Sequence, residues 1–167
     1  MPFLIDLAII GGGLTGTAML WQCIQTAKTT AGKNPHLFSR IRIQVVEKQE
    51  KFGPGFPHNP ENVLPFHITN MYASDMGILF ENPDDFNRWV IKHNDDLIDR
   101  YDWFKCFMDK YGDSVRHHYP RAIMGEYLQT RFHQAVQLAR KLGISVALHS
   151  STEVEKILSE KKGFCLL

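Results

Sequence analysis

The chain has 167 residues, of which 44% are hydrophobic and 22% charged, and its formal net charge is +1 at pH 7. This length and composition are ordinary for one globular domain that buries a sizeable core. The basic residues are scattered along the sequence, which gives no sign of a surface for nucleic acid or anionic membranes, so we expect neither partner.

Three cysteines, Cys23, Cys106 and Cys165, are widely spaced and form no Cys-x-x-Cys motif. An odd number of cysteines without such a pattern is typical of reduced thiols, so we expect a cytoplasmic protein. The first residues lack the basic region of a signal peptide, and no apolar run reaches the ~18 residues that a membrane span needs.

A strand, a glycine turn and a helix are predicted at the start of the chain. The nearly continuous apolar run 3–10 predicts a buried strand, and residues 14–28 predict a helix. Between them, Gly11, Gly13 and Gly16 form a Gly-x-Gly-x-x-Gly motif. In this context the motif is typical of a turn that holds the pyrophosphate of a dinucleotide.

Each glycine of the motif has an expected physical role. Gly11 permits the tight turn, Gly13 lets a pyrophosphate approach because it has no Cβ, and Gly16 lets the helix pack close to the strand. The helix N-terminus adds free N–H groups and a partial positive charge that favour a phosphate.

Other glycine-rich loops fit the sequence less well. A kinase loop joins two strands and is followed by a strand lysine, neither of which is seen here. A Walker loop ends in Gly-Lys-Ser/Thr, whereas Gly32-Lys33-Asn34 lacks the hydroxyl group. A glycine turn that binds nothing is the remaining alternative.

A second strand is predicted over residues 41–47, which are rich in β-branched side chains, and it completes a βαβ unit. Glu47 at its end can accept hydrogen bonds from a ribose diol. It lies farther beyond Gly16 than the usual ~20 residues. The intervening loop can absorb the excess, because loop length costs little entropy. A glutamate that simply faces solvent is the alternative.

A loop rich in glycine and proline, residues 52–57, comes next, and residues 59–76 show no clear period. The polar side chains of this region are either site residues or ordinary loop residues: His58, His67, Asn70 and Asp75.

Residues 82–120 predict a helical insertion. Asn82-Pro83 and the acidic residues after them are typical of a helix start, and a second helix is expected over residues 97–111. The aromatic residues here indicate a core rather than a cofactor site. The pair His117-His118 has neither metal-ligand spacing nor an accompanying Cys, His or Glu cluster, so we expect no metal site.

The last part of the sequence predicts a helix over about 122–142, a third parallel strand over 144–149, and a β-hairpin formed by residues 153–158 and 163–167. Arg121 lies at the helix start, where its guanidinium can meet a phosphate or face solvent. The apolar end of the chain suggests the N-terminal part of a longer protein.

Four stretches share a pattern with one known group of proteins. They are 6–18 with the glycine fingerprint, Val45-Val46-Glu47-Lys48 followed by Gly53-Pro54-Gly55, 66–76 followed by 83–90, and Pro120-Arg121 followed by Gly125-Glu126-Tyr127-Leu128. Together they resemble the N-terminal part of the FAD/NAD(P)-binding flavoprotein oxidoreductases, in particular the sub-family named FAD-NAD(P)-binding. The glycine fingerprint occurs in many flavoproteins, whereas the Pro-Arg element is more particular.

The resemblance implies bound FAD, with its AMP half on residues 11–16 and Glu47, with Arg121 helping to hold it and with the backbone around Val154 beside the adenine. The cofactor-binding residues implied in this way are Gly11, Gly12, Gly13, Leu14, Thr15, Gly16, Glu47, Lys48, Gly55, Arg121 and Val154. The resemblance is also consistent with NAD(P)H as a co-substrate. It identifies neither a catalytic base nor a substrate.

We therefore expect an α/β fold in one domain over residues 1–167, with a Rossmann-like parallel sheet, a helical insertion over about 82–120 and a small terminal β-hairpin. The expected function is FAD binding within an NAD(P)H-linked, flavin-dependent oxidoreductase. The alternative is a non-catalytic dinucleotide-binding or regulatory domain. An NAD-only dehydrogenase is less favoured because of the three consecutive glycines and the lack of a recognisable hydride-transfer base.

Overall fold

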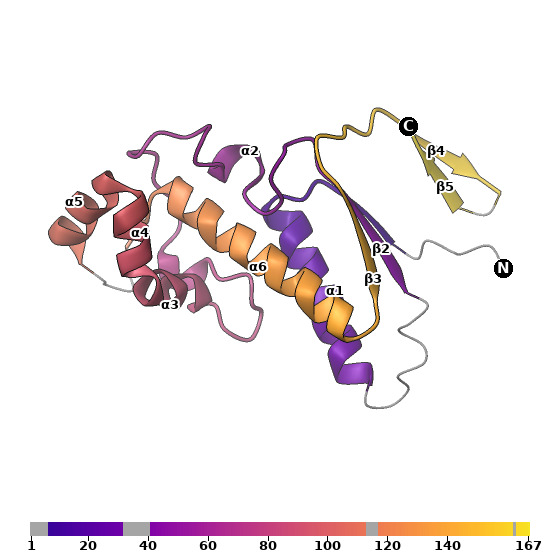
Figure 1. Ribbon diagram of the computed structural model, residues 1–167, viewed down its shortest axis with the longest axis horizontal. Coiled ribbons are helices and arrows are strands. Elements are labelled where there is room, and N and C mark those ends of the chain that lie inside the picture. The colour runs from indigo at the N-terminus through magenta and orange to yellow at the C-terminus, as the bar shows by residue number, and fades with distance from the viewer. Residues whose placement is uncertain (1–6, 32–40, 113–116, 162) are drawn as a thin grey trace.

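The computed structural model of the chain describes residues 7–31, 41–112, 117–161 and 163–167 (Figure 1). It has the predicted α/β fold, with a three-stranded parallel sheet, helices and a two-stranded antiparallel hairpin. The elements are, in chain order, β1 Leu7–Ile10, α1 Leu14–Ala31, β2 Arg42–Val46, α2 Gly55–His58, η2 Ala73–Asp75 (a 3₁₀ turn), α3 Asp85–Lys92, α4 Asn94–Arg100, α5 Asp102–Tyr111, α6 Arg121–Lys141, β3 Ser145–His149, β4 Ile157–Glu160 and β5 Gly163–Leu166.

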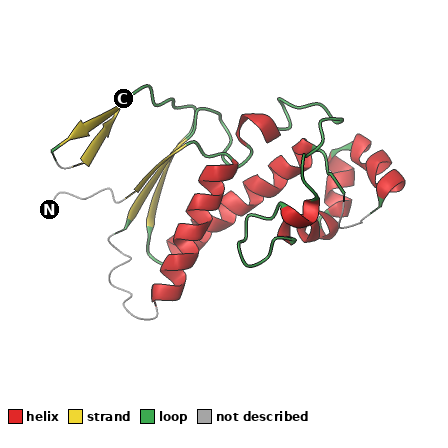
Figure 2. Cartoon of the chain, turned by 180° about the vertical axis from the view of Figure 1, so that it is seen from behind, coloured by secondary structure: helices red, strands yellow, loops and turns green. Residues whose placement is uncertain are grey.

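The central strand of the sheet is β2, which pairs in parallel with β1 on one side and with β3 on the other. In this register Val45 lies between Ile9 and Leu148. The long helices α1 and α6 pack side by side on one face of the sheet (Figures 1 and 2), where Ile9 and Val45 are buried. This is the arrangement that two strand–helix–strand units produce.

Helix α6 belongs to two hydrophobic cores. Its C-terminal half contributes Phe132 and Ala139 to the core formed with α1 and the sheet. Its N-terminal half contributes Tyr127 and Leu128 to a second core, formed with the insertion helices α3, α4 and α5. Because one 21-residue helix serves both cores, α6 fixes the insertion relative to the sheet.

The start of the insertion differs from the prediction. Helix α3 begins at Asp85, because Asn82 and Pro83 belong to a turn. In that turn the Asp85 N–H donates to the Asn82 carbonyl at 3.0 Å, and the Gly77 N–H donates to the Pro83 carbonyl at 2.8 Å. Asn82 and Pro83 therefore form a turn just before α3, and Asn82 is not the N-cap of that helix.

The single helix predicted over residues 97–111 is wrong, because α4 and α5 meet at Tyr101 in an extended conformation (φ −134°, ψ 92°). The Tyr101 hydroxyl donates to the Glu126 carboxylate of α6 at 2.6 Å. This contact with a distant helix accompanies a break that local helical preference does not predict.

Other boundaries shift by a few residues. The predicted 52–57 loop contains the start of the short helix α2, and α1 continues to Ala31. Strand β4 begins at Ile157 instead of residue 153. Residues 3–6 of the predicted first strand lie outside the described residues, as does Lys162 of the predicted hairpin turn.

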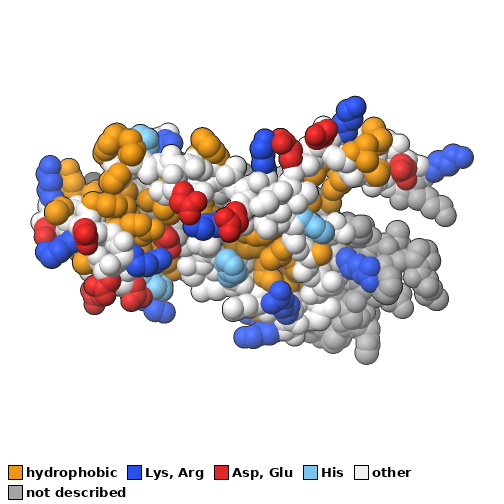
Figure 3. Space-filling view, turned by 45° about the horizontal axis from the view of Figure 1, so that its top comes forward, with side chains coloured by type: hydrophobic (Ala, Val, Ile, Leu, Met, Phe, Trp, Pro, Cys, Tyr) orange, Lys and Arg blue, Asp and Glu red, His pale blue; other side chains and the backbone are white. Residues whose placement is uncertain are grey.

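The hairpin stands apart from the three-stranded sheet (Figure 1), and the side chains of β4 are exposed. On the face drawn in Figure 3, acidic and basic side chains of the described residues are interspersed rather than gathered by sign. Among the helices of the described ranges, none combines the length and the apolar character that crossing a membrane requires.

Candidate functional site

The glycine turn lies at the carboxyl end of the parallel sheet, between β1 and α1. Gly11 has a positive φ of 93°, a conformation that favours glycine, and its N–H donates to the Val46 carbonyl at 2.8 Å. The Gly53 N–H donates to the Gly12 carbonyl at 2.7 Å. Backbone hydrogen bonds therefore join the turn both to the end of β2 and to the loop that follows it.

Gly16 occupies a position where only glycine fits. A Cβ there would overlap the carbonyl oxygen of Gly11 and would lie 3.3 Å from Cγ2 of Ile9. Helix α1 therefore approaches β1 as closely as the third glycine of the motif predicts.

Gly13 and Gly55 lie against each other. A Cβ on Gly13 would stand 3.2 Å from the Cα of Gly55, the first residue of α2. The missing side chain thus serves a close backbone contact within the chain, while its role toward a pyrophosphate stays a prediction.

The first turn of α1 is suited to an anion. The side chains of Leu14 and Thr15 are exposed, and the first turn holds no acidic residue. The N-terminal N–H groups and partial positive charge of α1 are therefore not balanced by a carboxylate on that turn. Thr17, which the sequence analysis did not single out as a site residue, is fully buried, and its hydroxyl donates to the Gly12 carbonyl at 3.3 Å.

Glu47 is the only carboxylate with a hydrogen bond to the glycine turn among the described residues. It is only 6% exposed, its Oε2 accepts the Gly12 N–H at 2.6 Å, and its Oε1 accepts the Gln49 N–H at 2.7 Å. Its backbone N–H donates to the His149 carbonyl at 2.8 Å. The sheet and the turn together therefore hold the carboxylate in a fixed position.

Lys48 follows Glu47 directly, and Val154 lies two residues beyond Thr152, which contacts this strand end. The Thr152 N–H donates to the Glu47 carbonyl at 3.0 Å, which brings the segment after β3 to the site. The Lys48 amine forms an ion pair with Glu153 at 2.7 Å, and both side chains are more than half exposed. An exposed pair of this kind contributes only ~0–1 kcal/mol.

Arg121 contacts the irregular segment that precedes η2. Its backbone N–H donates to the His67 carbonyl at 2.7 Å, its Nε to the Ile68 carbonyl at 3.1 Å, and its Nη2 to Oδ1 of Asn70 at 3.3 Å. In the described part of the chain, Arg121 makes no hydrogen bond to the glycine turn. The structure thus assigns Arg121 a role in holding residues 67–70 on the start of α6.

Helix α2 connects the glycine turn to the start of α6. Its first residue, Gly55, contacts Gly13, and a Cβ on Gly125 would overlap the carbonyl oxygen of His58, its last residue. Burial lowers the pKa of His58, and the positive charge of Arg121 lowers that pKa further. The neutral imidazole of His58, at the end of α2, and the guanidinium of Arg121, at the start of α6, therefore lie on the side of α2 away from the glycine turn.

From sequence, His58 and Asn70 are either site residues or ordinary loop residues. No spacing rule joins them to Arg121, because the three belong to separate segments that fold together. Within the described residues, no group of three or more His, Cys, Asp or Glu side chains could hold a metal ion.

A family model described as FAD-NAD(P)-binding matches residues 8–167 of the chain. The match spans the glycine turn, Glu47, the insertion and α6, and it supports dinucleotide binding by this fold. A comparison of the sequence with curated proteins gives no match. Since the family match covers nearly the whole chain, the chain belongs to the FAD-NAD(P)-binding family.

Proposed function

We propose that the chain binds FAD as part of an NAD(P)H-linked, flavin-dependent oxidoreductase. The observation that carries this proposal is the buried Glu47 carboxylate, which is bonded to the Gly12 N–H at the carboxyl end of the sheet. Position, burial and chemistry all suit the ribose of the AMP half.

Glu47 retains acceptor capacity for a ribose. An ionised carboxylate offers about four lone-pair sites, and protein N–H groups use one on each oxygen. A ribose diol can donate to those that remain. Because the carboxylate is held by backbone groups, little side-chain entropy is lost when it binds.

The pyrophosphate would lie at the start of α1, beside Gly13 and Leu14. The helix has 18 residues and no acid in its first turn, so its N-terminus offers unbalanced N–H donors. The adenine would lie near Val154, because the Thr152 hydrogen bond holds that segment beside Glu47.

The groups beyond the turn favour a flavin over a nicotinamide. The second half of the dinucleotide would run along α2 toward neutral His58 and cationic Arg121. A guanidinium disfavours the cationic ring of oxidised nicotinamide, whereas it stabilises a ring that gains electron density. Phe56 and Phe66, both largely exposed, provide apolar surface for a planar ring. The flavin would supply the hydride chemistry, and the chain would supply position and electrostatics.

The first test is the visible absorption spectrum of the purified chain and of the supernatant released by heat, followed by calorimetric titration with FAD, ADP and NAD⁺. We expect flavin bands or FAD binding, ADP binding through the shared half, and bleaching of the flavin by NAD(P)H. Binding of ADP or NAD⁺ without any affinity for flavin would instead favour the non-catalytic dinucleotide-binding alternative.

A further inference from the structure

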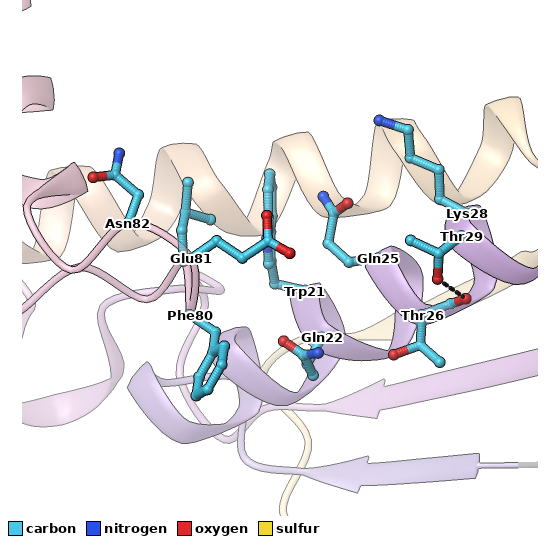
Figure 4. A pocket seen from close by; sticks show the side chains of 10 residues that line it. Trp21, Gln22, Gln25, Thr26, Lys28, Thr29, Phe80, Glu81 and Asn82 are labelled. Atoms are coloured by element: carbon cyan, nitrogen blue, oxygen red, sulfur yellow. Dashed lines mark hydrogen bonds between the residues drawn. The ribbon is translucent and has the colours of Figure 1, made fainter.

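A hollow of about 600 Å³ lies on the outer face of α1 (Figure 4). Its floor is the α1 segment 21–29, including Trp21 and Gln25, and its wall is the loop 79–82 that precedes α3. The residues that line it are separate from those of the glycine turn.

Phe80 projects from this loop with 88% of its surface exposed. Two backbone hydrogen bonds hold the loop closed, from Gly77 to the Pro83 carbonyl and from Asn82 to the Leu79 carbonyl, both at 2.8 Å. A single exposed phenylalanine needs no explanation by itself. Here, however, the exposed ring of Phe80 stands at the edge of an open hollow, on a loop whose backbone is held by two hydrogen bonds.

The ends of the hollow carry opposite charges. Glu81 lies on the loop, and Lys28 lies at the far end of the α1 segment (Figure 4). Neither forms an ion pair with another described residue. The surface thus combines an exposed aromatic ring, a hollow, and two side chains of opposite charge, Glu81 and Lys28.

We propose that this surface takes a second copy of the chain in a twofold dimer. The twofold axis would lie in the plane of the interface, perpendicular to α1 and above Gln25. Rotation about this axis sets the two α1 helices antiparallel. It brings Glu81 of each copy to Lys28 of the other, and Phe80 of each over the hollow of the other. The two Gln25 amides then face each other, and each can donate and accept one hydrogen bond.

A second copy accounts for these features better than a small ligand does. A ligand within the hollow leaves the outer face of Phe80 in water, whereas a facing protein surface covers it. The 10 lining residues are fewer than the ~20–30 that each side of a standard interface contributes, so we expect a weak dimer that forms at high protein concentration.

Sedimentation velocity over a range of concentrations tests the proposal. The wild-type chain is expected to show a monomer–dimer equilibrium, and Phe80→Ser should raise the dimer dissociation constant at least about tenfold. Phe164→Ser is the matched control, because Phe164 is 75% exposed on the separate hairpin. The proposal is overturned if the wild-type chain stays monomeric up to a protein concentration of ~1 mM. It is also overturned if Phe164→Ser weakens the dimer as much as Phe80→Ser does.

A charge exchange tests the twofold geometry. Glu81→Lys and Lys28→Glu should each raise the dissociation constant by about fivefold or more, because each places like charges opposite one another. The double variant restores opposite charges at both ends and should return to within about twofold of wild type. Both charge substitutions, like Phe80→Ser and Phe164→Ser, lie at exposed positions, and thermal unfolding checks that each variant remains folded. If the single variants weaken the dimer and the double variant does not recover, the twofold pairing is overturned.

Discussion

The two halves of α6 are held by different kinds of interaction. The C-terminal half packs apolar side chains against α1 and the sheet, whose strands are joined by backbone ladders and glycine contacts. The N-terminal half meets the insertion through an aromatic core and a buried network around Asp85. Apolar packing holds both halves, but close backbone approach adds to it on the sheet side, whereas a buried network of charged and polar side chains adds to it on the insertion side.

The network joins α3 to α6. The Asp85 carboxylate accepts the Tyr127 hydroxyl at 2.7 Å and the Arg131 Nε and Nη2 at 2.8 and 2.6 Å. The Tyr127 oxygen in turn accepts the Ile78 N–H at 2.9 Å. Burial first, and then the hydrogen bond to Asp85, raise the pKa of Tyr127, so the hydroxyl remains a donor at neutral pH.

The largest expected effect comes from breaking this network. Asp85→Ala leaves the Arg131 guanidinium, whose side chain is 15% exposed, without its carboxylate, which should cost ~3–5 kcal/mol of unfolding free energy. Urea denaturation measures the loss, and hydrogen exchange should show it first in α3. Asp109→Ala is the control, because its pair with Lys105 is exposed to solvent, so its loss should leave the unfolding free energy nearly unchanged. Equal losses in the two variants would mean that the buried Asp85 network stabilises the insertion no more than an exposed ion pair does.

Gly16→Val tests the close backbone approach on the sheet side. The new Cβ overlaps the Gly11 carbonyl, so α1 must move away from β1, at a cost of about 3 kcal/mol. Met19→Val on the same helix is the control, because Met19 is 47% exposed. Hydrogen exchange should show lost protection in β1 and α1 before α3. Loss confined to the insertion would contradict the assignment.

The sheet half was predictable from sequence because its signals are local. A Gly-x-Gly-x-x-Gly motif between an apolar run and a helical pattern predicts the turn, and β-branched residues predict β2. The Gly16 contact follows directly from the role of the third glycine in that motif.

The insertion and the far end of the site were less predictable because their contacts join distant segments. Asp85 and Arg131 are 46 residues apart, and Arg121 and Asn70 are 51 apart. The α4–α5 break at Tyr101 accompanies a hydrogen bond to Glu126, which no local pattern indicates. The same holds for Gly125, whose close approach to α2 is visible only once the chain is folded.

Glu47→Ala tests the proposed ribose contact on the sheet side. Loss of charge-assisted hydrogen bonds should weaken ADP binding by ~1–3 kcal/mol, as measured by calorimetry. The change also leaves the Gly12 and Gln49 N–H groups without their acceptor, so urea denaturation must be measured in parallel. A folded variant with unchanged ADP affinity would remove Glu47 from the ribose site.

The smallest expected effect concerns α2, which touches both regions. Burial and then the charge of Arg121 lower the pKa of His58 from its ordinary value of 6.5, although the Pro54 carbonyl acts in the opposite direction. As pH falls, the unfolded chain therefore takes up the proton first. The depressed pKa of His58 therefore contributes to the free energy of unfolding. This contribution is fully present above about pH 6.5 and is lost as the pH falls from there toward the pKa of His58 in the folded chain.

NMR titration of the His58 ring in wild type and Arg121→Met measures the two causes separately. Removing the guanidinium should raise the pKa only partway toward 6.5, because burial is the larger cause. His58→Gln should flatten the dependence of the unfolding free energy on pH below pH 6.5. A His58 ring that titrates above 6.5 would contradict the lowered pKa.

Because α2 contacts Gly13 at one end and Gly125 at the other, protonation of His58 should loosen the glycine turn and the start of α6 together. A response confined to one of them would mean that α2 does not couple the two regions.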